Sequence, residues 1–152
     1  MCVDDKIDDV CELMKNRRLD SLCVNETKRK GSGGAIKYGS FYAYGPGVDQ
    51  SPRESRGVGF MVSQRLSECV NRYECVSPRF LWLQFKMGVT QIFILVVYAP
   101  DISKSLEERE EFWADVKDIL MKYNRNESLV ILGDFNGWMV AQQDGYKKFG
   151  CL

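Results

Sequence analysis

The chain has 152 residues, a length that favours one domain. Its 21 basic and 21 acidic residues cancel, so no overall field draws the chain to nucleic acid or to an anionic membrane. Histidine is absent, which excludes a Ser-His-Asp triad, a Cys-His pair and a His-ligated zinc site built from these residues alone.

The apolar residues point to a globular intracellular protein. They make up 45% of the chain, enough to fill a core. None of the six cysteines forms a CxxC pair, so we expect reduced thiols rather than a disulfide scaffold. No run approaches the roughly 18 apolar residues of a membrane span, and the acidic N-terminus lacks a signal-peptide pattern. We expect a nuclear or cytoplasmic location and no membrane partner.

The first third of the chain is predicted to contain one helix, two short strands and a long loop. Apolar residues recur at helical spacing over 3–17, followed by a short buried strand over 19–25. The stretch 28–56 is polar and rich in glycine, and we expect a loop there apart from a strand at 40–44.

The middle of the chain predicts a series of strands. They are expected over 57–62, 67–76, 79–86 and 91–98. Alternation of Leu81, Leu83 and Phe85 with more polar residues indicates a half-buried strand. The continuously apolar run at 91–98 is typical of a central strand covered on both faces.

A second helix is predicted over 104–123, with Ser105 and Glu108 as a capping box. Its core stripe consists of Phe112, Val116, Ile119 or Leu120, and Tyr123. A last strand over 128–132 is stopped by Gly133, and the tail over 144–152 is polar. This order of elements predicts an α/β fold, with sheets packed face to face and helices outside.

Polar residues follow three of the predicted strands. Glu26 lies in Asn25-Glu26-Thr27, Tyr98 ends the central strand, and Asp134 and Asn136 lie in Gly133-Asp134-Phe135-Asn136-Gly137. Glu26 is a plausible Mg²⁺ ligand, because this ion prefers oxygen and takes one or two carboxylates. Asp134 could orient or deprotonate a water, Asn136 could hold that water or a phosphate oxygen, and Tyr98 could donate to the phosphate.

Each of these residues also has a purely structural interpretation. Glu26 fits a solvated loop, Asp134 with Asn136 fits an Asx turn, and Tyr98 fits a core aromatic with a satisfied hydroxyl. Taken together and in this order, the four residues favour the catalytic interpretation, whereas no single one of them does.

Four segments together resemble the endonuclease/exonuclease/phosphatase superfamily. They are Leu22-Cys23-Val24-Asn25-Glu26-Thr27-Lys28, Arg56-Gly57-Val58-Gly59-Phe60, Val97-Tyr98-Ala99-Pro100 and Leu132-Gly133-Asp134-Phe135-Asn136-Gly137-Trp138. The pattern looks closest to the apurinic-like endonucleases of non-LTR retrotransposons and to craniofacial development protein 2-like proteins. It covers nearly the whole chain, in family order.

The resemblance implies a DNase I-like sandwich of two mixed sheets that cleaves DNA with Mg²⁺, or with Mn²⁺ in its place. By that resemblance Glu26 is the metal ligand, Asp134 and Asn136 are the water-activating and phosphate-orienting pair, and Tyr98 is the active-site tyrosine. The run Lys28-Arg29-Lys30 beside Glu26 could contact DNA phosphates, although a solvated loop explains it too.

The chain departs from the family pattern in ways that bear on activity. Asn25 replaces the usual glutamine, and neither the family's N-terminal strand with its asparagine nor its Ser-Asp-His segment is present. We therefore expect residues 1–152 to form one partial domain, incomplete at both ends, with weak metal binding and impaired catalysis. Unpaired sheet edges should favour self-association. Two alternatives remain, a non-catalytic remnant or protein-binding module, and a phosphatase of the same superfold.

Overall fold

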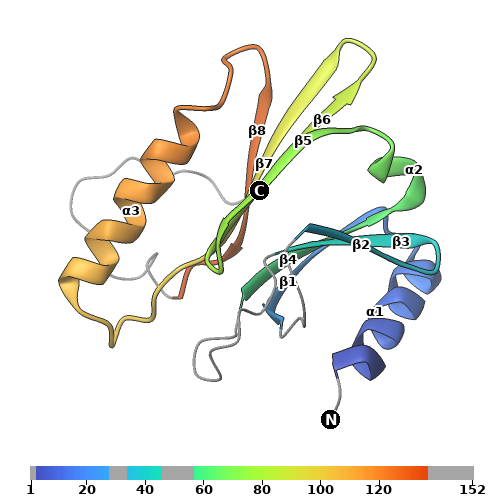
Figure 1. Ribbon diagram of the computed structural model, residues 1–152, viewed down its shortest axis with the longest axis horizontal. Helices are drawn as coiled ribbons and strands as arrows, with labels where there is room; N and C mark the ends of the chain where they lie inside the picture. The colour runs from blue at the N-terminus through green and yellow to red at the C-terminus, as the bar shows by residue number, and fades with distance from the viewer. Residues whose placement is uncertain (1–2, 28–33, 46–56, 137–152) are drawn as a thin grey trace.

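The computed structural model describes residues 3–27, 34–45 and 57–136, which form two four-stranded sheets with helices outside them (Figure 1). The elements are α1 (Val3–Arg17), β1 (Ser21–Thr27), β2 (Gly34–Tyr38), β3 (Phe41–Gly45), β4 (Gly57–Ser63), α2 (Gln64–Ser67), β5 (Val70–Ser77), β6 (Phe80–Met87), β7 (Thr90–Tyr98), α3 (Leu106–Leu120) and β8 (Ser128–Asp134). Lys28, Arg29, Lys30 and the polar tail over 144–152 lie outside the described residues.

The strands are ordered β1-β4-β3-β2 in one sheet and β5-β6-β7-β8 in the other. All described strand pairs are antiparallel except β7 with β8, which run parallel because α3 crosses over between them. This is the α/β sandwich of two sheets with outer helices that the sequence predicts. No helix in the described part of the chain is long and apolar enough to cross a membrane.

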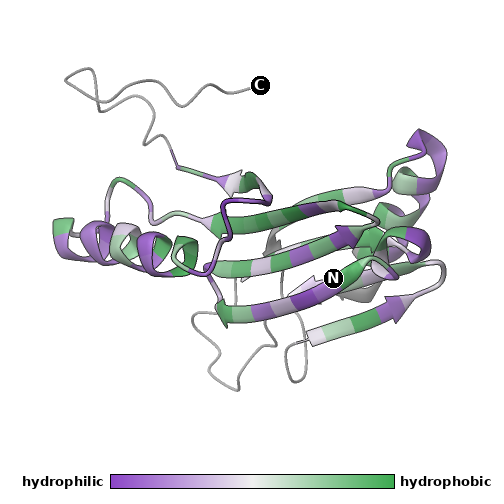
Figure 2. Cartoon of the chain, turned by 90° about the horizontal axis from the view of Figure 1, so that it is seen from above, coloured by the Kyte–Doolittle hydropathy of each residue, from purple (hydrophilic) through white to green (hydrophobic). Residues whose placement is uncertain are grey.

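Three apolar clusters hold the layers together. Between the sheets, alternate residues of β4 and β6 interdigitate, including Val58, Phe60 and Leu83, which are almost fully buried. On the outer face of β6 and β7, Phe80 stacks on Phe112 of α3 with ring centroids 4.9 Å apart. On the other outer face, Met14 of α1 is buried against β3 and β4. Figure 2 shows the resulting alternation of apolar and polar residues around α3.

Both long helices were predicted correctly in position. α1 has the predicted bounds, and α3 is shorter than predicted because it begins at Leu106 and residues 121–122 continue only as a turn. Ser105 caps α3 by accepting a hydrogen bond from the Glu108 amide at 3.2 Å. Its predicted core stripe is confirmed: Phe112, Val116 and Ile119 are buried, and Tyr123 packs against the same cluster.

Several details of the predicted elements were wrong, including the bounds of β1, which was expected over 19–25 and is Ser21–Thr27. A strand, β2, forms where a loop was expected, because Ala35 to Tyr38 pair with β3. The expected strand over 67–76 is preceded by the short helix α2 and begins at Val70. β6 was expected to be a half-buried strand, but both of its faces are covered, since Phe80 and Trp82 are buried on the side of α3. Gly133 does not end β8, which continues to Asp134.

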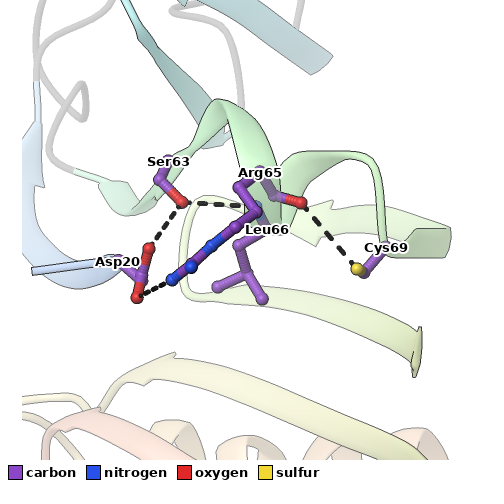
Figure 3. Close-up of polar contacts among 5 residues, drawn as sticks. All are labelled: Asp20, Ser63, Arg65, Leu66 and Cys69. Atoms are coloured by element: carbon purple, nitrogen blue, oxygen red, sulfur yellow. Dashed lines mark hydrogen bonds and ion pairs between the residues drawn. The ribbon is translucent and has the colours of Figure 1, made fainter. Parts of the chain in front are cut away.

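The turn between α1 and β1 is fastened to the end of β4 by a polar cluster (Figure 3). The Asp20 carboxylate accepts from Ser63 Oγ at 2.9 Å and from Arg65 Nη2 at 2.8 Å. Ser63 Oγ in turn accepts from the Leu66 amide and so caps α2. Since 82% of the Arg65 side chain is exposed, the ion pair adds little stability and serves mainly to fix the turn.

β8 lies close against β7 at Gly133. This glycine has a φ of 141°, a backbone conformation that other residues rarely adopt. A Cβ built there would overlap the Val97 carbonyl oxygen and lie 2.8 Å from the carbonyl carbon. The parallel ladder therefore reaches Asp134 only because residue 133 has no side chain.

We predict that Gly133→Ala lowers the free energy of unfolding by about 2–4 kcal/mol, since both backbone strain and overlap with Val97 must be relieved. The matched control is Gly39→Ala, where φ is 58° but nothing lies within 4 Å of the added Cβ. It should cost about 1 kcal/mol. Denaturant unfolding measures both values, and equal losses for the two variants would contradict the close approach of β8 to β7.

Candidate functional site

Tyr98 and Asp134 lie side by side where the two parallel strands end. They are register partners in the β7–β8 ladder. Leu132 packs into the cluster between the sheets, so Asp134, two residues further along, is on the same face. Tyr98 packs against that cluster too. Both polar groups are thus presented at one end of the sandwich.

Asn136 is held beside Asp134 by a turn. Its backbone amide donates to Asp134 Oδ1 at 2.8 Å, and its φ of 46° is in the left-handed region that asparagine tolerates. The Asn136 side-chain amide donates to the Ala99 carbonyl, and the Ala99 amide donates to the Asp134 carbonyl at 2.8 Å. The Asx turn allowed by the sequence is therefore present, and it fixes Asp134 and Asn136 at the end of β7.

The strand that carries Glu26 ends at the same side of the molecule. Thr27 of β1 pairs with Gly57, and the next residue, Val58, donates its amide to the Pro78 carbonyl at 2.9 Å. One residue on, the Arg79 carbonyl accepts from the Tyr98 amide at 2.9 Å. β1 and β8, one strand from each sheet, also lie close to each other.

These backbone links place the end of β1 near Tyr98 and Asp134. The Glu26 side chain itself, like Lys28, Arg29 and Lys30, lies outside what the structure describes. The backbone course of β1 is therefore the structural evidence that bears on Glu26.

Arg79 is a residue of this site that sequence analysis missed. Its guanidinium Nη1 donates to the Tyr98 carbonyl at 3.1 Å, and its centre lies 5.8 Å from the centroid of the Tyr98 ring. A guanidinium has five N–H donors, so this contact leaves further donors for an anion. The signal in the sequence is weak: an arginine after Ser77-Pro78, at a turn that precedes a buried strand.

The donor chemistry of the site suits a hard cation. Asp134 uses Oδ1 in the turn, which leaves Oδ2 as an oxygen ligand or a proton acceptor. No three His, Cys, Asp or Glu side chains of the described residues are grouped to bind a metal. Mg²⁺ does not need such a group, because it commonly binds one or two carboxylates and keeps several waters. Glu26 with bound waters would form a donor set of that kind, which leaves Asp134 Oδ2 to accept a proton.

Cys23 does not provide an alternative nucleophile. It packs into the cluster between the sheets, and burial raises the pKa of its thiol to about 11. The reactive form of cysteine is the thiolate, which is therefore scarce at neutral pH. This leaves an activated water as the nucleophile that the described site can best support.

A separate hollow lies on the opposite face of the second sheet. It has a volume of about 330 Å³ and is lined by Arg72, Glu74, Trp82, Gln84, Phe93 and Lys122. Glu74 accepts from Trp82 Nε1 at 3.1 Å and from Lys122 Nζ at 2.7 Å. Hydrogen bonding from Lys122 also lowers the Glu74 pKa, so the carboxylate stays charged and paired with that lysine. These contacts account for the polar groups of the hollow without a ligand.

Comparisons with known proteins agree with one part of the resemblance seen in the sequence. No protein-family model matches the chain. Over 138 residues, or 91% of its length, the chain is 26% identical to craniofacial development protein 2 of Bos taurus and 26% identical to that of Tragulus javanicus. It spans 23% and 24% of the lengths of these two proteins. The chain is thus a distant relative of craniofacial development protein 2, aligned with about a quarter of that protein.

Proposed function

We propose that this chain carries part of the active site of a Mg²⁺-dependent phosphodiesterase that cuts DNA, and that the 152 residues alone react slowly. The observation that carries the proposal is the β7–β8 register, which sets Tyr98 beside Asp134 at the end of the sandwich where β1 also ends. The similarity to craniofacial development protein 2 and the four sequence motifs support it; DNA as substrate rests on the motifs alone.

In this proposal Glu26 would hold Mg²⁺, which would supply positive charge to the phosphate oxygens. Asp134 accepts a proton from the attacking water. The water oxygen forms a bond to phosphorus, the bond from phosphorus to the leaving sugar oxygen breaks, and that oxygen takes up a proton from solvent. Asn136 holds Asp134 in place through its backbone amide, and Tyr98 donates its phenolic proton in a hydrogen bond to a phosphate oxygen.

Slow turnover follows from the residues available. The chain has no histidine, so the donor that the family resemblance assigns to the scissile phosphate is not among these residues. Losing one preorganised transition-state donor typically costs about 100- to 1000-fold in rate. Activity should therefore be measured with protein in excess over supercoiled plasmid, so that one nick per molecule is detected.

We predict that Asp134→Asn reduces Mg²⁺-dependent nicking at least about 100-fold, because asparagine cannot accept the proton from water. The amide oxygen of the new side chain can still accept from Asn136, so the turn and the fold are retained. Asp118→Asn, an exposed change on α3, is the matched control and should leave nicking intact. EDTA and Glu26→Gln should also abolish nicking. Activity retained in Asp134→Asn, or lost equally in the control, would refute the assignment.

Arg79 provides a second test, directed at phosphate binding. Arg79→Gln removes the positive charge beside Tyr98. We expect the DNA concentration for half-maximal nicking to rise about tenfold, because one charge-assisted hydrogen bond of roughly 1.5 kcal/mol is lost. Arg79→Lys keeps the charge and should recover part of that loss. If both variants bind and nick DNA like the unchanged chain, Arg79 only supports the Tyr98 backbone.

If the chain nicks no DNA but hydrolyses small phosphate monoesters in a manner that depends on Asp134, the phosphatase alternative holds. If neither reaction occurs, the non-catalytic alternative holds, and the Asx turn at Asp134 is purely structural.

A further inference from the structure

The Tyr98 carbonyl is bound by a side chain at a place where a regular sheet would use a backbone amide. Phe80 pairs with Val97 in the antiparallel β6–β7 ladder, so Arg79 and Tyr98 are the next residues opposite each other. Alternate pairs in such a ladder exchange two backbone hydrogen bonds. Here the Tyr98 amide donates to the Arg79 carbonyl at 2.9 Å, but the Tyr98 carbonyl accepts from Arg79 Nη1 at 3.1 Å. The guanidinium thus takes the place of one ladder bond.

The Arg79 amide, which would complete the ladder, is bound within the turn between β5 and β6. It donates to Ser77 Oγ at 3.1 Å, the bond of a turn in which a serine hydroxyl accepts from the amide two residues further on. The Pro78 carbonyl accepts from the Val58 amide at 2.9 Å, which fixes this turn against the first sheet. Because Ser77 engages the Arg79 amide, the Tyr98 carbonyl is left for the guanidinium.

We propose that Ser77 is a positioning residue, whose hydroxyl selects the conformation in which the Arg79 guanidinium lies at the Tyr98 ring and can bind a phosphate group. The inference rests on the proposed function, which makes phosphate the ligand of this site. The guanidinium centre lies 5.8 Å from the ring centroid, and its bond to the Tyr98 carbonyl uses one of five N–H donors. The remaining donors suit phosphate oxygens, which arginine often binds through two N–H groups.

The ladder itself provides the competing conformation. Without the Ser77 hydroxyl, the Arg79 amide regains the Tyr98 carbonyl as its ladder partner, since a half-buried amide pairs with the acceptor opposite it. The guanidinium then loses the bond that holds it at the site. Ser77→Ala should therefore release the Arg79 side chain while the sheet gains a regular backbone bond.

NMR tests the exchange of bonds directly, through the scalar coupling that is transmitted across a hydrogen bond. The coupling between the Arg79 amide nitrogen and the Tyr98 carbonyl carbon should be absent in the unchanged chain and present in Ser77→Ala. Ser77→Thr keeps a hydroxyl acceptor and should behave like the unchanged chain. So should the control Ser128→Ala, which alters an exposed serine at the other end of β8. A Ser77→Ala variant without this coupling overturns the proposal.

A titration with inorganic phosphate, followed by the Tyr98 amide resonance, tests the ligand without requiring catalysis. Half-saturation should need about three- to tenfold more phosphate in Ser77→Ala, because a charge-assisted contact is weakened, and Ser77→Thr should restore the affinity. In the Arg79→Gln background, Ser77→Ala should cause no further loss. Unchanged affinity in Ser77→Ala, or an equal loss in the Arg79→Gln background, would show that Ser77 does not act through Arg79.

The two readouts keep this inference separate from the proposed function. Phosphate binding that depends on Ser77 and Arg79 in a chain that nicks no DNA would support the inference and remove the proposed function. Asp134-dependent nicking in a chain whose Tyr98 amide does not respond to phosphate would overturn the inference alone.

Discussion

The arrangement of the candidate site depends on the parallel pairing of β7 with β8. In this ladder Tyr98 is the partner of Asp134, and the ladder reaches that far because Gly133 lets the backbone of β8 approach the Val97 carbonyl. Parallel strands end at the same edge of a sheet, which is where rigid elements can present polar groups toward a ligand. A side chain at position 133 would separate β7 from β8 just before the pair formed by Tyr98 and Asp134.

The rest of the fold supports this pair of strands. α3 is the crossover that makes the pairing parallel, and it buries Phe112 against the outer face of β6 and β7. The first sheet closes the other face through Val58, Phe60 and Val62. A path of backbone pairs from Thr27 through Val58 to Tyr98 then sets the end of β1 relative to the end of β7. The site is thus fixed by packing, by main-chain hydrogen bonds and by the side-chain bonds of Asp134, Asn136 and Arg79.

The sequence predicted long, strongly patterned elements well and short ones poorly. The stripe of Phe112, Val116 and Ile119 identified α3, because helical periodicity extends over several turns there. β2 was missed because its five residues follow a glycine-rich stretch, and its stability comes from pairing with β3 rather than from local preference. Gly133 was interpreted as a strand end, whereas its lack of a side chain allows the strand to continue.

The site residues were predicted from motif order, and their catalytic roles stay a prediction; the structure shows only where the described ones lie. Tyr98, Asp134 and Asn136 are brought together, each at a strand end where the sequence placed it. Arg79 could not be predicted, because its place beside Tyr98 follows from the β6–β7 pairing and not from any spacing in the sequence.

We propose that the ends of β1, β7 and β8 form one cation site. Mn²⁺ added to the isotopically labelled chain broadens amide resonances close to its binding site, and this test does not require catalytic activity. We predict that the amides of Tyr98 and of residues 134–136 broaden first, and that Glu26→Gln weakens the effect. The amides of 88–90, about 30 Å away at the other end of β7, should stay sharp. Broadening centred on the exposed Asp8 and Asp9 of α1, or none at residues 98 and 134–136, would contradict the account.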